Sequence, residues 1–202
     1  MSFGSQRATL LLDPLVSKTV AFLLNDRRSN LSLAWAILPF LMVREGCRVL
    51  DLDALYSSNA DTIAARVPPE LMGRLELTVP EAGSNIERTV TELFLDTTGR
   101  PLIIDSANTL YQLLSSRSPK SSSRKFAFLI AALSSWARAN ARLVFSSTYA
   151  RGTTARRKTA RSLSEMFDVV ISVSRKAGWL TLRCERGNAW REKTFFLPLE
   201  DG

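Results

Sequence analysis

Short apolar runs alternate with segments of helical character along most of this 202-residue chain, and no other feature constrains its fold as strongly. The runs have the length and composition of β-strands. They are Thr19–Leu24, Arg48–Asp53, Leu75–Val79, Leu102–Asp105, Arg142–Ser146, Phe167–Val173, Trp179–Cys184 and Thr194–Pro198. Because a helix that connects two strands of one sheet makes them parallel, the pattern predicts an α/β fold whose mostly parallel sheet is covered on both faces. A turn-like stretch at Glu185–Asn188 predicts that the last two strands form an antiparallel hairpin.

Helices are predicted between the strands, and the longest of them carry apolar residues at helical spacing. The predicted helices are Leu33–Val43, Thr62–Arg66, Asn85–Leu95, Thr109–Leu114 and Lys125–Ala141. No internal repeat is present, and no linker is long enough to separate two units. We therefore expect a single domain over residues 1–202.

Charge and composition narrow the possible functions. The formal net charge of +8 favours a polyanionic partner, with nucleic acid ahead of an anionic membrane surface. The chain contains no histidine, which excludes Ser-His-Asp and Cys-His catalysis as well as histidine-bound zinc. Cys47 and Cys184 alone form neither a disulfide framework nor a zinc site. We expect no metal and no cofactor.

The chain also lacks the sequence signals of secretion and membrane insertion. The apolar run Leu33–Val43 is shorter than the roughly 20 residues that a bilayer requires, and the N-terminus lacks the order of charged and apolar regions of a signal peptide. These features predict a cytoplasmic protein with no membrane partner, associated with the nucleoid if it binds DNA.

The segment between the first strand and the first helix has the layout of a phosphate-binding loop but lacks the residues that bind phosphate. When Asn25–Ser32 is set against G-x-x-x-x-G-K-[ST], Asn25 and Asn30 replace the glycines, Leu31 replaces the lysine, and only Ser32 matches. In such loops the glycines let backbone N–H groups surround the phosphates, and the lysine neutralises their charge. Leucine can do neither, so we expect a degenerate nucleotide site.

The order and spacing of these elements resemble the core ATPase domain of the RecA/RadA recombinase superfamily, including archaeal RadA-type paralogues and KaiC-like proteins. The most specific parts are Leu102–Ser106 with the following Leu110-Tyr111, the strand, basic loop and strand from Leu143 to Val173, and the ending from Leu182 to Leu199. The resemblance implies a three-layer RecA-like fold over nearly the whole chain.

The resemblance also assigns the family's catalytic positions. It places the phosphate-loop lysine at Leu31 and the glutamate that polarises the attacking water at Leu55. Asp53 and the metal-associated Asp105 are retained, while Thr148 stands where the family has a glutamine. Phosphoryl transfer depends on positioning and electrostatic stabilisation, so loss of the cation and of the water-orienting acid predicts a pseudo-ATPase. Asp105 can equally be a structural residue at the end of a strand.

The second half of the chain carries a long basic span. From Ser106 to Ser164 there is no aspartate or glutamate, whereas surfaces shaped by solubility usually mix both signs. In the RecA family, the loops after the fourth and fifth strands hold single-stranded DNA, and Ser115–Ser123 and Tyr149–Ala160 correspond to them. The candidate nucleic-acid-binding residues are Arg117, Lys120, Arg124, Lys125, Tyr149, Arg151, Arg156, Arg157, Lys158 and Arg161. Tyr149 beside Arg151 could stack a base while the arginine contacts the backbone.

The resulting hypothesis is a non-catalytic RadA-type paralogue that binds nucleic acid through two basic loops and supports recombination or DNA repair as a mediator or accessory subunit. Single-stranded DNA is the favoured ligand, with RNA as an alternative. An active recombinase or a second copy of the chain is the expected protein partner. Other interpretations stay open. The basic span can instead be a patch for an acidic protein partner. The chain can also be an RNA-binding structural subunit of a RecA-like ring, similar to the inactive subunits of Elongator, or a protein-binding regulator that resembles SulA.

Overall fold

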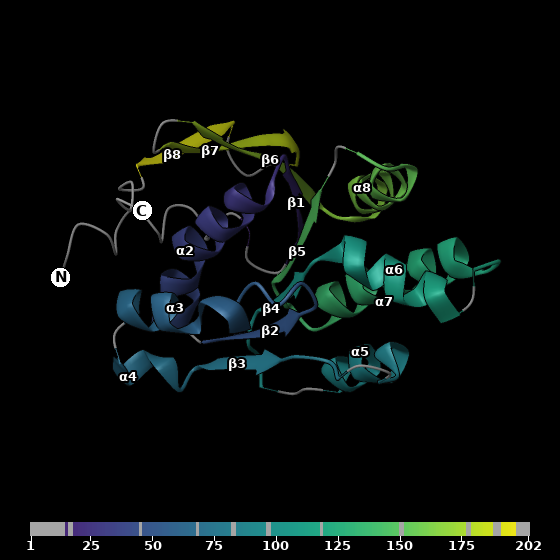
Figure 1. Cartoon of the computed structure of the whole chain (residues 1–202), viewed down its shortest axis with the longest axis horizontal. Helices are drawn as coiled ribbons and strands as arrows, with labels where there is room; N and C mark the ends of the chain where they lie inside the picture. Colours follow the sequence, from purple (N-terminus) through teal and green to yellow (C-terminus); the bar gives the residue numbers. More distant parts are fainter. Residues whose placement is uncertain are drawn as a thin grey trace.

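A computed structural model of the chain describes residues 15, 18–44, 46–67, 69–81, 84–95, 98–117, 119–149, 152–176, 179–187 and 191–196. Figure 1 shows its strands and helices. The strands are β1 (Thr19–Leu24), β2 (Cys47–Asp51), β3 (Leu75–Thr78), β4 (Leu102–Asp105), β5 (Val144–Tyr149), β6 (Val169–Lys176), β7 (Trp179–Arg186) and β8 (Glu192–Phe196). The helices are α2 (Arg27–Arg44), α3 (Ala60–Arg66), α4 (Pro69–Met72), α5 (Ile86–Phe94), α6 (Ala107–Arg117), α7 (Ser122–Ala139) and α8 (Thr154–Met166), with a 3₁₀ turn at Ser57–Asn59.

One mixed sheet runs through the molecule in the strand order β3-β2-β4-β5-β1-β6-β7-β8. From β3 to β6 in this order, each strand is parallel to its neighbour. At the far edge, β7 pairs antiparallel with β6, and β8 pairs antiparallel with β7. This confirms the predicted α/β class, the mostly parallel sheet and the antiparallel C-terminal strands. Of the helices in the described ranges, none is both long enough and apolar enough to cross a bilayer.

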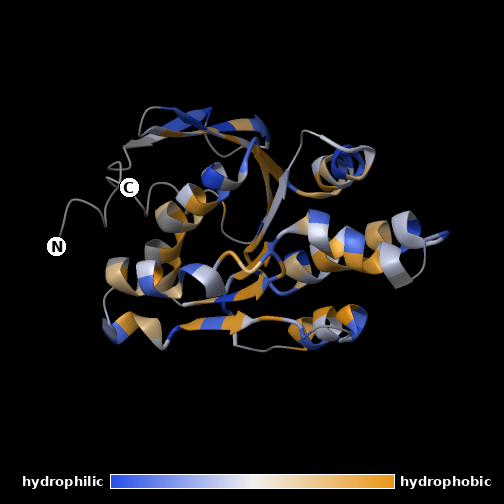
Figure 2. Ribbon diagram, in the orientation of Figure 1, coloured by the Kyte–Doolittle hydropathy of each residue, from blue (hydrophilic) through white to orange (hydrophobic). Residues whose placement is uncertain are grey.

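Both faces of the sheet are buried. Successive side chains of a strand point to opposite faces, so neighbouring residues of one strand belong to different cores. On β1, Phe22 belongs to the core on the side of α2 and α3, while its neighbour Ala21 belongs to the core beneath α5 to α8. On β5, Phe145 and Val144 divide in the same way. Figure 1 shows the two groups of helices on either side of the sheet, and Figure 2 shows apolar residues concentrated on the strands between them. The sheet is therefore the middle of three layers.

Helix α2 ends at Arg44, one residue beyond the predicted end at Val43, and Gly46 follows shortly after. Gly46 has a φ of +81°, and a Cβ there would lie 2.5 Å from the carbonyl oxygen of Arg74. Its N–H donates to the carbonyl oxygen of Leu41 at 2.8 Å, which satisfies one of the free carbonyls at the helix end. The chain then turns directly into β2.

The prediction that Tyr149–Ala160 forms a basic loop is wrong, because most of the segment belongs to α8. Thr153 caps this helix, since its side chain accepts a hydrogen bond from the N–H of Arg156. Thr159, Ala160 and Leu163 lie on one helical face and are buried. The segment is so rich in polar and basic residues that its short apolar stripe is easily missed. Ser115–Ser123 includes the end of α6, which extends to Arg117, and the start of α7 at Ser122, and the described residues between them, Pro119–Ser121, form a turn.

Candidate functional site

The carboxyl ends of four neighbouring strands bring most of the predicted nucleotide-site residues to one edge of the sheet. The strands are β2, β4, β5 and β1, which are adjacent in this order and parallel. Asp51 pairs in register with Asp105, and Leu24 pairs with Tyr149. This is the edge at which ligands of parallel α/β sheets bind.

The connection between β1 and α2 is much shorter than the sequence predicts. The helix begins at Arg27 rather than Leu33, so only Asn25 and Asp26 separate it from the strand. A carboxylate oxygen of Asp26 accepts a hydrogen bond from the N–H of Ser29 at 2.7 Å, as a helix-capping residue does. Without glycines to hold an open loop, the segment forms an additional helical turn. An acidic side chain thus occupies the helix N-terminus at which a phosphate would bind.

This extra turn also decides where the remaining residues of the degenerate site lie. Ser32 is fully buried, and Leu31 packs against the core on the α2 side of the sheet. Asn25 is exposed on the strand-to-helix connection, while Asn30 is buried beneath it. These four residues are close in sequence, but they do not converge on a common ligand position.

Asn30 and Asp105 form the centre of a buried polar cluster. One oxygen of Asp105 accepts hydrogen bonds from Asn30 Nδ2 and from Ser147 Oγ, both at 2.6 Å. Burial raises the pKa of Asp105 to about 6, although the hydrogen bonds from Ser147 and Asn30 oppose that shift and the nearby Asp53 and Asp51 add to it. Asp105 is fully buried, and both donors to this oxygen are neighbouring side chains. The geometry therefore supports a structural role for Asp105.

The two other acids at this edge are also engaged in structure. Asp53 accepts a hydrogen bond from the hydroxyl group of Thr109 on α6. Asp51 is buried, and its carboxylate accepts from the N–H groups of Tyr56 and Ser57, at 3.3 and 2.8 Å. Leu55, the position that the family resemblance gives to the water-polarising glutamate, is buried in the core. Within the described ranges, no three Cys, Asp or Glu residues are arranged to hold a metal ion.

Two hollows lie near this edge, and neither suits a nucleotide. A cavity of about 20 Å³ lies between α2 and the sheet, lined by Asn30, Tyr56 and Ser147 among apolar residues. It has room for about one water molecule. A groove of about 410 Å³ lies between the ends of β2 and β3 and the helices α5 and α6. Its described lining includes Asp51 and Glu81 but neither lysine nor arginine, which disfavours phosphate.

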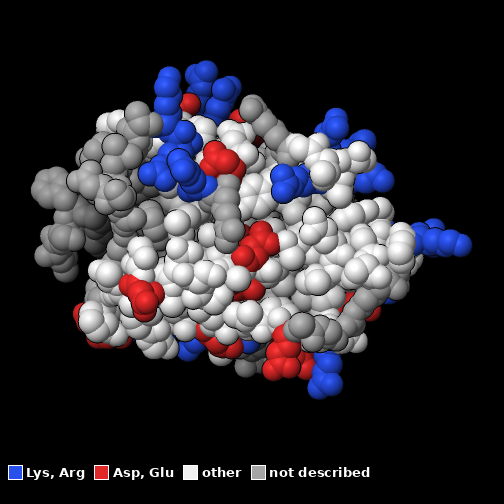
Figure 3. All heavy atoms as spheres, in the orientation of Figure 1, with Lys and Arg blue, Asp and Glu red and all other residues white. Residues whose placement is uncertain are grey.

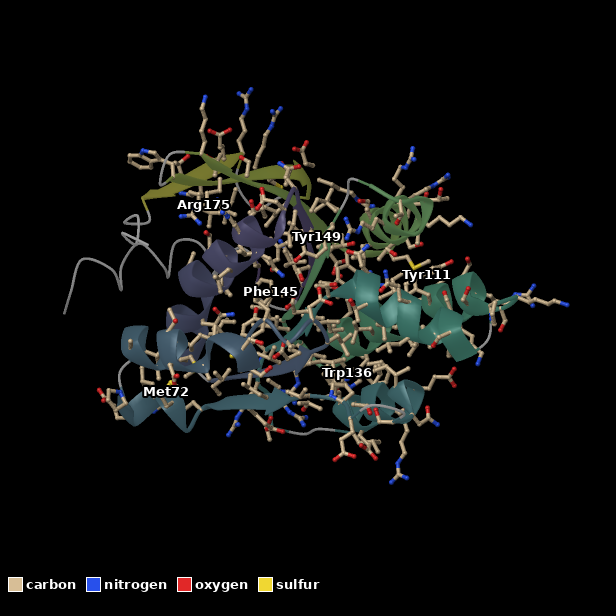
Figure 4. All side chains as sticks on the ribbon, viewed as in Figure 1. Met72, Tyr111, Trp136, Phe145, Tyr149 and Arg175 are labelled. Atoms are coloured by element: carbon tan, nitrogen blue, oxygen red, sulfur yellow. The ribbon has the colours of Figure 1, made fainter. Side chains whose placement is uncertain are left out.

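Helix α8 places a group of cations beside the same edge. Arg156, Arg157, Lys158 and Arg161 are all exposed on this helix, and Figure 2 shows its hydrophilic outer side. The guanidinium group of Arg156 lies over the ring of Tyr149, 5.5 Å from its centroid, a cation–π arrangement. Figure 4 shows Tyr149 at the end of β5, between α2 and α8. The phenol oxygen of Tyr149 in turn lies 3.5 Å from Asn30 Nδ2.

The cations of the earlier basic segment are more dispersed. Lys120 is exposed in the turn between α6 and α7, and Arg124 is exposed in the first turn of α7. Lys125 instead forms an ion pair with Glu87 of α5 at 2.7 Å, and Arg161 pairs with Glu165 of its own helix at the same distance. Figure 3 shows the cations at the tip of the α6–α7 pair separated by uncharged surface from those over α8. The side chain of Arg117 and the whole of Arg151 lie outside the described residues, so the predicted pairing of Tyr149 with Arg151 has no structural description.

Several residues of the cluster were not predicted as site residues. The side-chain oxygen of Asn108 accepts hydrogen bonds from Thr148 Oγ1 at 3.0 Å and from the N–H of Tyr149 at 2.6 Å. Ser147 donates to Asp105, and Thr109 donates to Asp53. The sequence feature that could have indicated these residues is the polar run Ser146–Tyr149 at the end of a strand that starts with apolar residues. Asn108, three residues after Asp105, is the second such feature.

Comparisons with protein-family models and with curated proteins find no match to this chain.

Proposed function

We propose that this chain is a non-catalytic relative of the RecA/RadA recombinases that binds nucleic acid, with single-stranded DNA as its main ligand. In this proposal the basic face of α8 and Tyr149 form the primary contact, and the exposed cations of the α6–α7 turn extend it. The protein would support DNA recombination or repair as a mediator or accessory subunit.

The observation that carries the proposal is the exposed group of four cations on α8, of which Arg156 lies over the ring of Tyr149. Arg156 and Arg157 lie near the start of the helix, where the helix dipole disfavours each positive charge by about 0.3–1 kcal/mol. Helix stability therefore does not account for their position, whereas phosphate binding does. An aromatic ring beside arginine is also the pair that holds a stacked base and its backbone.

The absence of catalysis is supported by the β1–α2 connection. Asp26 takes the hydrogen bond at the helix N-terminus, Leu31 packs on the core, and Asp105 is fully buried in hydrogen bonds with Asn30 and Ser147. Each of these works against a bound magnesium–nucleotide complex. Calorimetric titration with ATP and magnesium should give no heat of binding, and micromolar affinity would refute this part of the proposal.

A gel-shift comparison of single-stranded DNA, duplex DNA and RNA at two salt concentrations tests the binding itself. The triple variant R156E/R157E/K158E should lose at least about 100-fold in affinity for single-stranded DNA, and log K should depend less steeply on log salt, by about 2, because three phosphate contacts are lost. Unchanged affinity in this variant would refute the α8 interface. If the wild type bound RNA more tightly than DNA, RNA would be the main ligand and the assignment of single-stranded DNA would be wrong.

A matched pair of single variants separates a specific interface from net charge. Arg157 on α8 and Arg88 on α5 are both exposed helical arginines, on helices that Figure 1 shows well apart. R157E and R88E change the charge of the protein equally. Only R157E should weaken binding, and equal losses in the two variants would contradict a localised contact.

A further inference from the structure

The groove at the carboxyl ends of β2 and β3 takes no part in the α8 interface. Its volume is about 410 Å³, which is within the range of small-molecule sites, and its walls come from these strand ends and from α5 and α6. Figure 1 shows α5 beyond the end of β3, with α6 between α5 and α8. Parallel sheets bind ligands beyond the carboxyl ends of their strands, so the groove lies where a ligand other than nucleic acid could bind.

One part of the groove lining is apolar and incompletely covered. It includes Leu52, Pro80 and Ile86, together with Val79 and Leu113. Val79 is 50% exposed and Leu113 is 37% exposed, and both are among the few large apolar side chains that stay exposed in the described part of the chain. Because they line one groove, a ligand with a hydrocarbon portion could cover both, and burial of apolar surface would favour its binding.

The polar part of the lining accepts hydrogen bonds and has few protons to donate. The hydroxyl proton of Thr109 is donated to Asp53, and that of Ser116 is donated to the carbonyl oxygen of Leu113 at 2.9 Å. Each hydroxyl oxygen keeps lone pairs that can accept from a ligand. Glu81 is exposed, and its carboxylate forms no ion pair with another described residue. A ligand of this groove should therefore be rich in N–H donors.

The charge around the groove is negative, in contrast to that of the whole chain. Asp51 and Glu81 belong to the lining, and Asp53 is hydrogen-bonded to Thr109 of the lining. The charges of Asp53 and Asp51 are near enough to Asp105 to disfavour its ionisation. A hollow lined by one sign of charge concentrates ions of the opposite sign, so this groove attracts cations although the protein carries a net charge of +8.

We propose that the groove binds a linear polyamine, a chain of methylene groups that carries several ammonium groups. The ammonium groups donate hydrogen bonds to Glu81 and to the hydroxyl oxygens of Thr109 and Ser116. The methylene groups cover Val79 and Leu113. A metal ion would match the charge but not the apolar walls, and an anionic ligand would be repelled by the carboxylates. The proposal is independent of nucleic-acid binding by α8, because it uses none of the same residues.

Calorimetric titration of the protein with spermidine, in the absence of nucleic acid, tests the proposal. One spermidine should bind to each chain, and Glu81→Gln should weaken binding by about 10-fold to 150-fold, as loss of a hydrogen bond to a charged group does. Glu70→Gln removes an exposed carboxylate from α4, which Figure 1 shows at the other end of β3, and should leave the affinity unchanged. Absence of saturable binding at millimolar spermidine, or equal losses in the two variants, would overturn the proposal.

A second pair of variants tests the apolar wall. Val79→Lys places a cation in the groove and should abolish spermidine binding, because the new side chain fills space and repels the ammonium groups. Leu95→Lys adds the same charge at another exposed apolar side chain, outside the described lining, and should bind spermidine as the wild type does. Both positions are at least half exposed, so neither lysine has to be buried. Loss of binding in both variants, or in neither, would overturn the proposal.

Competition separates a polyamine site from a site for cations in general. Magnesium at the same concentration as spermidine should displace little of it, because the ion keeps most of its water shell and gains nothing from the apolar wall. If magnesium displaced spermidine equally well, charge alone would account for binding and the proposal would be wrong.

Discussion

Replacement of Asp105 by asparagine should change how the stability of this protein depends on pH. Burial raises the pKa of Asp105 in the folded protein from its ordinary value of 3.8 to about 6. The folded state therefore binds the proton more tightly than the unfolded state does. Below about pH 4 the group is protonated in both states. As the pH rises from about 4 to 6, the unfolded state ionises first, and the free energy of unfolding falls.

The magnitude follows from the difference between the two pKa values. At about 1.4 kcal/mol for each pH unit, a pKa raised from 3.8 to about 6 lowers the stability at neutral pH by about 3 kcal/mol relative to strongly acidic solution. Asparagine stays neutral at every pH, and its side-chain oxygen can still accept hydrogen bonds from Asn30 and Ser147, as Asp105 Oδ1 does. Its amide nitrogen would take the place of the second carboxyl oxygen and can add a fixed cost that does not vary with pH.

Urea unfolding followed by circular dichroism at pH 4.5, 5.5, 6.5 and 7.5 measures this effect. The stability of Asp105→Asn relative to wild type should rise by about 2 kcal/mol between pH 4.5 and 7.5, which is the part of the 3 kcal/mol that falls in this window. Ser146→Ala provides a control at a neighbouring buried polar residue without a titrating group, and its difference from wild type should not vary with pH. A constant difference for Asp105→Asn, or one that changes in the opposite direction, would refute the buried, easily protonated carboxyl group.

Three further changes test other parts of the fold. Asp26→Ala removes the cap of α2 and should cost about 1 kcal/mol in urea unfolding, whereas an increase in stability would contradict the capping role. Asp168→Asn should cost about 1–3 kcal/mol at pH 7. Partial burial opposes ionisation of Asp168, but hydrogen bonds from Thr19 and the charge of Arg138 outweigh it and hold the pKa of Asp168 below its ordinary value. The stabilisation is therefore present above pH 4 and is lost as the pH falls further. A stability difference between Asp168→Asn and wild type that persists in strong acid would contradict this. Leu163→Ala should cost about 2–5 kcal/mol, because this fully buried side chain anchors α8, and a loss below 1 kcal/mol would indicate that the helix is not held by its apolar face.

Much of the fold was predictable because its signals are local. The run Thr19–Leu24 and the Leu102–Asp105 segment form the strands that their apolar character predicts, with the predicted bounds. Helix α5 begins after Asn85, whose side chain accepts from two N–H groups of the first turn, and residues at helical spacing cover its buried face. Burial of one face and hydrogen bonding of the backbone impose these patterns on neighbouring residues, so one sequence displays them.

The start of α2 and the nature of α8 were not predictable in the same way. Alignment with a phosphate-loop pattern placed a loop at Asn25–Ser32, but Asp26 caps a helix that begins at Arg27. The polar composition of Tyr149–Ala160 indicated a loop, but burial of Thr159 and Leu163 against the rest of the protein stabilises a helix. In both cases a small contribution from capping or burial decides between two conformations that the composition permits.

The sequence by itself determined the alternation of strands and helices, the positive charge of the second half and the absence of a lysine from Asn25–Ser32. Only the tertiary structure decided which distant residues meet. The strand order brings Asn30 to Asp105 and Arg156 to Tyr149, and the pairing register sets Trp179 opposite Lys176. The physical reason is that a strand's own residues fix its two faces, whereas its neighbours in the sheet are fixed by the packing of the whole chain.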